Sequence, residues 1–208
     1  DHITNPRRDG KHQPVLKPEE QPAGVLVALD VATGKLRWKR SDDIFGTQLA
    51  VSEQHGVVLM NYQAVRHRFF KLPSEIGSRI AAVDAATGKR LWNAKADYKT
   101  RPLINDNVVY AQGGAWDLKS GKPMPFELNR SYGCGQISAS ANLMLFRSGT
   151  LGYLDLSRKA GTENYGGIRT SCWINAIPAG GLVLVPDGST KCRCSYQMQA
   201  WFALRERE

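Results

Sequence analysis

Four cysteines carry the most distinctive chemistry of this 208-residue chain, and all of them lie in its C-terminal part, at Cys134, Cys172, Cys192 and Cys194. An even set of clustered cysteines favours two disulfides and an oxidising compartment, which would be periplasmic or extracellular. A direct bridge between Cys192 and Cys194 would close a strained ring, so we expect Cys134 and Cys172 each to pair with one of them. Free thiols and a four-thiolate zinc site are the alternatives, although the usual chelating spacing of zinc ligands is absent.

Polar and aromatic residues beside these cysteines form the candidate ligand-binding site. They lie in loops that precede or leave predicted inner strands, and they combine hydrogen-bond donors, cations and flat rings that suit an anion or a sugar. The alternative is that the arginines only pair with carboxylates or carbonyls between neighbouring sheets. The candidate ligand-binding residues are Gln136, Arg147, Arg169, Trp173, Asn175 and Tyr196.

The sequence assigns no catalytic residue and no metal site. It contains no nucleophile elbow, paired-carboxylate signature or phosphate-binding loop. The histidines, His2, His12, His55 and His67, have no ligand-like spacing.

The net charge of +9 favours acidic partners such as anionic glycans, nucleic acid or an anionic membrane surface. The densest basic run, Arg66–Lys71, is interleaved with aromatic rings, which can grip nucleic acid. No nucleic-acid-binding signature accompanies it, so we expect a solvated sheet edge there and no nucleic-acid partner. No stretch is long and apolar enough to span a membrane.

Two near-identical stretches, Ala28–Trp38 and Ala82–Trp92, show how the chain is organised. In each, an alternating strand runs into Asp-x-x-Thr-Gly-Lys, a tight turn whose Gly requires positive φ, and then into a second strand that ends in Trp. The spacing of the copies is typical of propeller blades or β-solenoids. Asp30, Asp84 and Asp117 are predicted to cap the turns.

Further copies of the unit follow. Residues 100–127 predict four strands and three turns, with Pro125 where the earlier copies have Trp. Weaker copies centre on Tyr153–Asp155 and Ala203–Arg205.

The pattern Ala-x-Asp-x-x-Thr-Gly-Lys-x-x-Trp resembles the repeat of the PQQ-like β-propellers, which include quinoprotein alcohol dehydrogenases and non-enzymatic outer-membrane assembly lipoproteins. The resemblance implies an all-β fold of four-stranded antiparallel blades over residues 23–208, after a charged, Pro-containing segment over residues 1–22. It implies a structural, blade-docking role for Ala28, Gly34, Trp38, Ala82, Gly88 and Trp92.

The second half carries a further resemblance, to the closing blades of large PQQ-like propeller proteins. Its motifs are Gly133–Gly135, Phe146–Gly149, Tyr165–Arg169, Cys172–Trp173, Pro178–Leu182 and Cys192–Tyr196. About four to five blades are present, fewer than such rings contain. A small ring that completes one blade from both termini is one solution. We expect instead a partial ring, the C-terminal part of a larger propeller, whose open edge is covered by the remaining blades, another chain or a second copy.

Three functions are compatible with this sequence. We expect a non-catalytic scaffold or interaction domain with no cofactor. A fragment of a PQQ-dependent dehydrogenase is one alternative, which would need PQQ, Ca²⁺ and a carboxylate base. The chain lacks the adjacent cysteine pair that such dehydrogenases often carry. A polysaccharide-binding or polysaccharide-acting module, for instance for an anionic glycan, is the other alternative.

Overall fold

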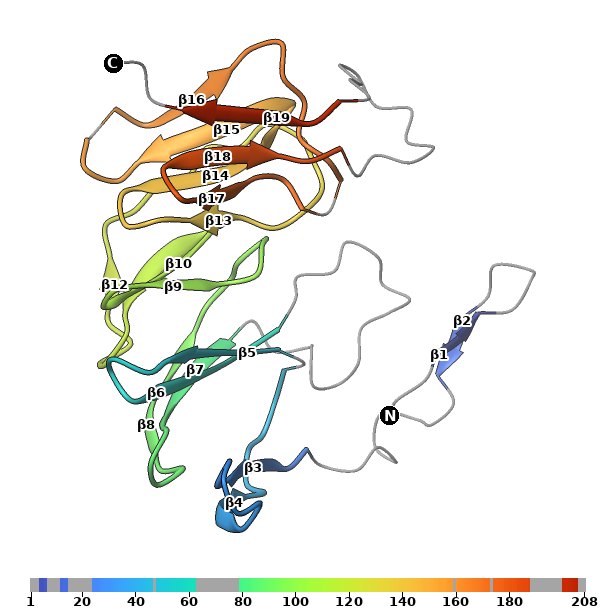
Figure 1. The fold of residues 1–208 in the computed structure, drawn as a ribbon. Coiled ribbons are helices and arrows are strands. Elements are labelled where there is room, and N and C mark those ends of the chain that lie inside the picture. The colour runs from blue at the N-terminus through green and yellow to red at the C-terminus, as the bar shows by residue number, and fades with distance from the viewer. Residues whose placement is uncertain are drawn as a thin grey trace. The chain divides into compact units, whose positions relative to one another are not determined.

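The computed structural model describes residues 4–6, 12–14, 24–46, 48–62, 79–158, 160–172, 174–187 and 200–205. These residues form strands and turns, with no helix among them and so none that could cross a membrane (Figure 1). The chain divides into two compact units. The first contains Asp1–Lys99 and Trp116–Pro123, and the second contains Thr100–Ala115 and Met124–Glu208.

Three sheets have four strands each, arranged in chain order as in propeller blades. The first comprises β5 (Gln48–Ser52), β6 (Val57–Asn61), β7 (Arg79–Asp84) and β8 (Arg90–Lys95). The next comprises β9 (Leu103–Asn105), β10 (Val108–Ala111), β11 (Gly114–Asp117) and β12 (Pro123–Met124). The third comprises β13 (Ser138–Ala139), β14 (Leu143–Ser148), β15 (Thr150–Asp155) and β16 (Thr162–Tyr165).

Three smaller sheets complete the described strands. A two-stranded sheet pairs β3 (Leu26–Leu29) with β4 (Leu36–Arg40), and a three-stranded sheet contains β17 (Ile177–Ala179), β18 (Leu182–Val185) and β19 (Phe202–Arg205). In the N-terminal segment, β1 (Thr4–Pro6) pairs with β2 (His12–Pro14). The sequence does not predict this last hairpin, because proline at the strand ends is unfavourable for sheet pairing.

The same hydrogen bonds close each copy of the turn motif. In the second copy, Asp84 Oδ1 accepts from Thr87 N at 2.7 Å and from Thr87 Oγ1 at 2.6 Å. Gly88 has a φ of 70°, which glycine adopts without strain. Asp30 with Thr33, and Asp117 with Ser120, repeat the arrangement. The turn-capping role predicted for the three aspartates is confirmed.

The turn aspartates should make the chain less stable at acidic pH. Hydrogen bonds from Thr87, partly opposed by desolvation, hold the pKa of Asp84 below its ordinary value of 3.8, and the pKa values of Asp30 and Asp117 are lowered in the same way. A lowered folded-state pKa gives stability that is present above the unfolded-state pKa and lost as pH falls through the folded-state pKa. We expect the urea midpoint to be steady above about pH 5 and to fall below about pH 4.

Asp84→Asn is the matched variant for this measurement. The amide oxygen can accept from Thr87 at every pH, so the variant should lose less stability than the wild type between about pH 6 and about pH 3. Equal losses in the two proteins would contradict the assignment.

The tryptophans of the first two motif copies lie on the turn of the following copy, within the first compact unit. Trp38 Nε1 donates to the carbonyl oxygen of Ala85 at 2.9 Å, and Trp92 Nε1 donates to that of Leu118 at 2.8 Å. Each ring also rests on a motif glycine, Gly88 and Gly121 respectively. Such rings supply much of the apolar area of a core, and here Trp92 is buried and Trp38 is partly buried.

Apolar residues from both faces of the sheets are buried. In the first unit, Leu26 and Phe45 pack with Met60, Ala81 and Val83, and the Trp38 ring contacts this cluster. In the second unit, β14 places alternate residues in two clusters, since Met144 and Phe146 belong to one and Leu145 to the other. Burial on both faces is what a blade with a neighbour on each side requires.

Candidate functional site

Four of the six candidate ligand-binding residues, Gln136, Arg147, Arg169 and Asn175, are described, and all four belong to the second unit. Trp173 and Tyr196 lie outside the described residues, as does the basic run at residues 66–71. Because β14, β15 and β16 are antiparallel, the last residues of β14 and of β16 lie at the same end of the sheet. The turn that follows Asp155 lies at the opposite end. The four candidate residues lie at this first end of the sheet or in the loops that extend from it.

Arg147 and Arg169 converge on one sulfur atom. Arg147 is fully buried, and its Nη1 lies 3.9 Å from Cys172 Sγ. Arg169 is also buried, and its Nη2 lies 3.5 Å from the same sulfur. The Arg147 guanidinium also lies 5.7 Å from the centroid of the Tyr132 ring. The guanidinium groups of two buried arginines therefore meet at this sulfur.

Asn175 joins loops to each other. Its Oδ1 accepts from Arg147 N at 2.9 Å, and its Nδ2 donates to the carbonyl oxygens of Cys134 at 3.1 Å and Ser171 at 3.0 Å. A Cβ on Gly135 would lie 2.2 Å from this Nδ2, so the loop and the amide fit closely. These contacts give Asn175 a structural role in the site.

Gln136 and Arg130 make further hydrogen bonds around the loop that contains Cys134 and Gly135. Gln136 Oε1 accepts from Arg101 N at 3.3 Å. Arg130 Nε donates to the carbonyl oxygen of Arg147 at 2.5 Å, and its Nη2 donates to that of Cys134 at 2.8 Å. Arg130 is not among the candidates predicted from the sequence, because nothing in its local pattern separates it from other loop arginines.

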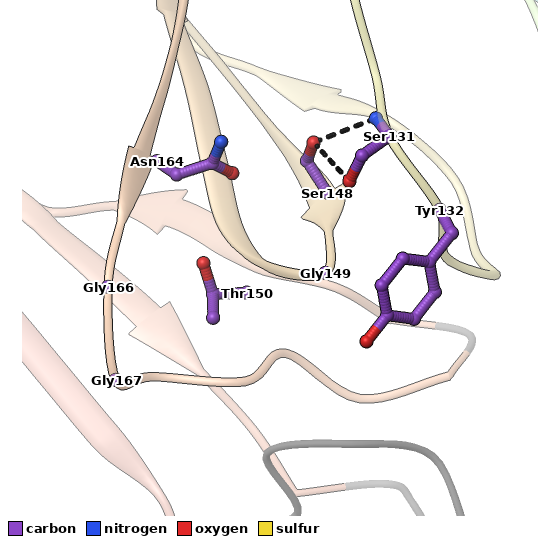
Figure 2. A pocket seen from close by; sticks show the side chains of 8 residues that line it. All are labelled: Ser131, Tyr132, Ser148, Gly149, Thr150, Asn164, Gly166 and Gly167. Atoms are coloured by element: carbon purple, nitrogen blue, oxygen red, sulfur yellow. Dashed lines mark hydrogen bonds between the residues drawn. The ribbon is translucent and has the colours of Figure 1, made fainter.

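A pocket of about 370 Å³ lies at the same end of the β13–β16 sheet, where β14 and β16 end. Figure 2 shows Tyr132 facing Thr150 and Asn164 across this pocket, with Ser131 and Ser148 hydrogen-bonded above them. The lining side chains are neutral hydroxyls, an amide and one aromatic ring, a set that suits an uncharged, hydroxyl-bearing ligand. The lining residues are Ser131, Tyr132, Ser148, Gly149, Thr150, Asn164, Gly166 and Gly167.

Of the four candidates that the structure describes, none lines this pocket. Glycines within two of the motifs singled out from sequence, Gly149, Gly166 and Gly167, do line it. Gly149 has a φ of 74°, and its N–H donates to the carbonyl oxygen of Tyr132 at 2.6 Å. The glycines of these motifs are therefore the feature of the sequence from which the pocket could have been found. Gly149 allows the turn between β14 and β15 to approach the loop that contains Tyr132.

No disulfide joins Cys134 to Cys172. Cys192 and Cys194 lie outside the described residues, so the two predicted disulfides stay a prediction. Within the part of the chain that the structure describes, no group of three or more histidine, cysteine, aspartate or glutamate side chains is arranged to hold a metal ion.

Comparison with known proteins identifies the repeat. Residues 22–122 match the sequence model of a family described as outer membrane protein assembly factor BamB. The chain is built from PQQ-like β-propeller repeats. The predicted repeat family and the predicted fold class are thus confirmed. No curated protein sequence matches the chain.

Solved structures agree with the propeller fold. BamB from Moraxella catarrhalis superimposes with a TM-score of 0.52 at 16% identity, covering 80% of this chain and 50% of that one. The computationally designed Ika4 protein gives a TM-score of 0.50 at 15% identity, covering 76% of this PQQ-like chain and 88% of the designed one. At these identities the likeness concerns the fold alone. The chain spans about half the length of the BamB structure.

Proposed function

We propose that this chain is a non-catalytic propeller scaffold, part of a larger propeller, that binds protein through its β3–β4 blade, which has two strands within the described residues. The observation that carries the proposal is the exposed apolar face of β3. Val27 and Leu29 are 47% and 55% exposed, although their repeat positions in β7 are the buried Ala81 and Val83. Both strands share the same register irregularity after the repeat alanine, which supports this alignment.

The neighbour of β7 indicates what should cover β3. Ala81 and Val83 are buried by Leu26 and Phe45, together with Trp38, from the preceding part of the chain. By repeat symmetry, Val27 and Leu29 should be covered by an equivalent apolar face from another blade. Full burial of such a side chain contributes about 1.5–3 kcal/mol, and about half of that remains to be gained here because Val27 and Leu29 are about half exposed.

The backbone of β3 also has a position for a further strand. Within the described residues β3 pairs with β4 alone, whereas the equivalent β7 pairs with both β6 and β8. An open edge next to an apolar face is a template for strand addition. The remaining blades of a longer protein, or another chain that supplies them, are the partner we propose.

The name of the matched family suggests the setting. The family is described as an outer membrane protein assembly factor, and we propose a protein-binding role in a periplasmic or extracellular location for this chain. The cysteine content supports an oxidising compartment.

Titration of the purified chain with PQQ and Ca²⁺ tests the scaffold proposal against a quinoprotein. We expect no saturable binding at micromolar quinone and no alcohol-dependent reduction of an artificial electron acceptor. A quinoprotein alcohol dehydrogenase assayed in parallel is the positive control. Saturable binding together with dye reduction would overturn the scaffold proposal.

The hydroxyl-lined pocket is the specific observation that favours a second candidate, a polysaccharide-binding module. Retention on an immobilised neutral polysaccharide, lost in Tyr132→Ala, would support this candidate. Tyr132 is partly exposed, so its removal should leave the fold intact.

A further inference from the structure

The side chains that the β13–β16 sheet contributes to the hydroxyl-lined pocket come from one of its faces. Ser148 pairs with Thr150 across the turn between β14 and β15, and Gly152 pairs with Asn164 across β15 and β16. Thr150 and Gly152 are two residues apart on one strand, so they and their partners share a face of the sheet. Ser148, Thr150 and Asn164 therefore point to the same side, as Figure 2 shows.

The loop that carries Tyr132 is fixed to the end of this sheet. Gly149 N donates to the carbonyl oxygen of Tyr132 at 2.6 Å, and Ser131 N donates to Ser148 Oγ at 3.0 Å. The Arg147 guanidinium lies over the Tyr132 ring, 5.7 Å from its centroid. These contacts hold Tyr132 in place while the residue stays 45% exposed, so the rest of its ring is open to a ligand.

A second wall of the pocket is also held by the protein. Leu151 N donates to the carbonyl oxygen of Ile168 at 2.8 Å, which keeps the segment with Gly166 and Gly167 beside β15. A Cβ on either glycine would meet nothing within 4 Å, so this wall presents backbone with open space beside it. Because both walls are held before a ligand arrives, binding does not have to order them, which lowers its entropic cost.

Three polar groups at the pocket are available to a ligand. Among the residues that the structure describes, the hydroxyls of Tyr132 and Thr150 and the amide of Asn164 have no hydrogen-bond partner. Asn175 differs, because its amide oxygen and nitrogen both bond to backbone groups. The lining thus offers one ring, two hydroxyls and an amide, and none of the described residues that form it is charged.

We infer that this pocket binds a single uncharged sugar unit of a glycan. The C–H face of the sugar ring packs on the Tyr132 ring, and its hydroxyls, which both donate and accept, bond to Thr150 and Asn164. This ligand belongs to the polysaccharide-binding candidate function, on which the inference rests. A volume of about 370 Å³ is at the small end of the range for ligand sites, so the rest of the glycan extends into solvent.

Salt dependence separates this pocket from the charge of the whole chain. The net charge of +9 attracts anionic glycans to the surface in general, and salt screens that attraction. A neutral sugar held by packing and hydrogen bonds is not subject to this screening. Its binding should therefore persist at about 1 M salt, where the Debye length is about 3 Å.

Saturation-transfer difference NMR with the whole chain tests the inference. The neutral probes are cellotetraose, maltotetraose and N-acetylchitotetraose, and tetragalacturonate is the anionic comparison. At about 1 M salt we expect saturable transfer to at least one neutral probe, concentrated on one of its sugar rings, and none to tetragalacturonate.

Two substitutions remove the proposed contacts one at a time. Tyr132→Ala should weaken binding of the neutral probe by about tenfold or more, because it removes the ring on which the sugar packs. Thr150→Val keeps the shape of the side chain without its hydroxyl and should weaken binding by about threefold to tenfold.

Tyr165→Ala is the matched control. Tyr165 is 49% exposed and follows Asn164 on β16, but successive side chains of a strand point to opposite faces, and it does not line the pocket. This variant should bind the neutral probe as the wild type does. Circular dichroism checks that all three variants are folded.

Two outcomes would overturn the inference. One is the absence of transfer to all three neutral probes, and the other is binding that both Tyr132→Ala and Thr150→Val leave unchanged. Retention on an immobilised polysaccharide that is insensitive to Tyr132→Ala would refute this pocket and keep glycan binding at another place on the chain. The quinone titration judges the scaffold proposal separately.

Discussion

Replacing Trp92 by alanine should lower the free energy of unfolding by about 3–5 kcal/mol. The Trp92 side chain is only 8% exposed, its ring covers Gly121, and its N–H has a partner in Leu118. The variant would lose a large buried apolar surface and leave the Leu118 carbonyl without its donor. Urea denaturation followed by far-ultraviolet circular dichroism measures the change.

Trp201→Ala is the control for this experiment. Trp201 is 74% exposed, so the same chemical change should alter the free energy of unfolding by no more than about 0.5 kcal/mol. Similar losses in the two variants would show that Trp92 does not act through burial.

Gly121→Ala should cost more stability than Gly34→Ala, by about 1–3 kcal/mol. The two glycines share a turn motif and a positive φ, so both variants bear the strain of a side chain in the left-handed region, about 1–2 kcal/mol. Only at Gly121 does the new methyl group also meet an indole ring. Equal costs, measured by urea denaturation, would contradict the close contact.

A double-mutant cycle isolates this contact. In a Trp92→Ala background the ring is gone, so Gly121→Ala should cost only about as much as Gly34→Ala does in the wild type. An unchanged cost in that background would mean that the penalty arises from the backbone alone.

The sequence predicts the repeated hairpins well because their information is local. Asp84, Thr87 and Gly88 form their turn with hydrogen bonds among themselves, so the motif specifies the geometry without help from the rest of the fold. The short hairpin of β1 and β2 is not predicted, because its prolines and charged neighbours do not form a recognisable strand pattern.

The candidate site is less predictable because it depends on contacts distant in sequence. The sequence makes Arg147 a candidate by its residue type and its neighbours, with pairing inside the protein as the alternative, but its burial beside Cys172 and Tyr132 follows only from the fold. The side-chain amide of Asn175 donates to the backbone carbonyl of Cys134, 41 residues away, a contact that no local pattern announces. The pocket residues Thr150 and Asn164 are ordinary strand residues until the sheet brings them together.

The indole contacts in the first unit run in one direction. Trp38 lies on the second copy of the turn and Trp92 on the third, while Pro125 takes the tryptophan position of the third copy itself. The surface of a blade that presents the indole is therefore not the surface that presents the glycine turn. Association through this contact is heterologous: it can close a ring or extend an array, but two identical surfaces cannot pair through it about a twofold axis.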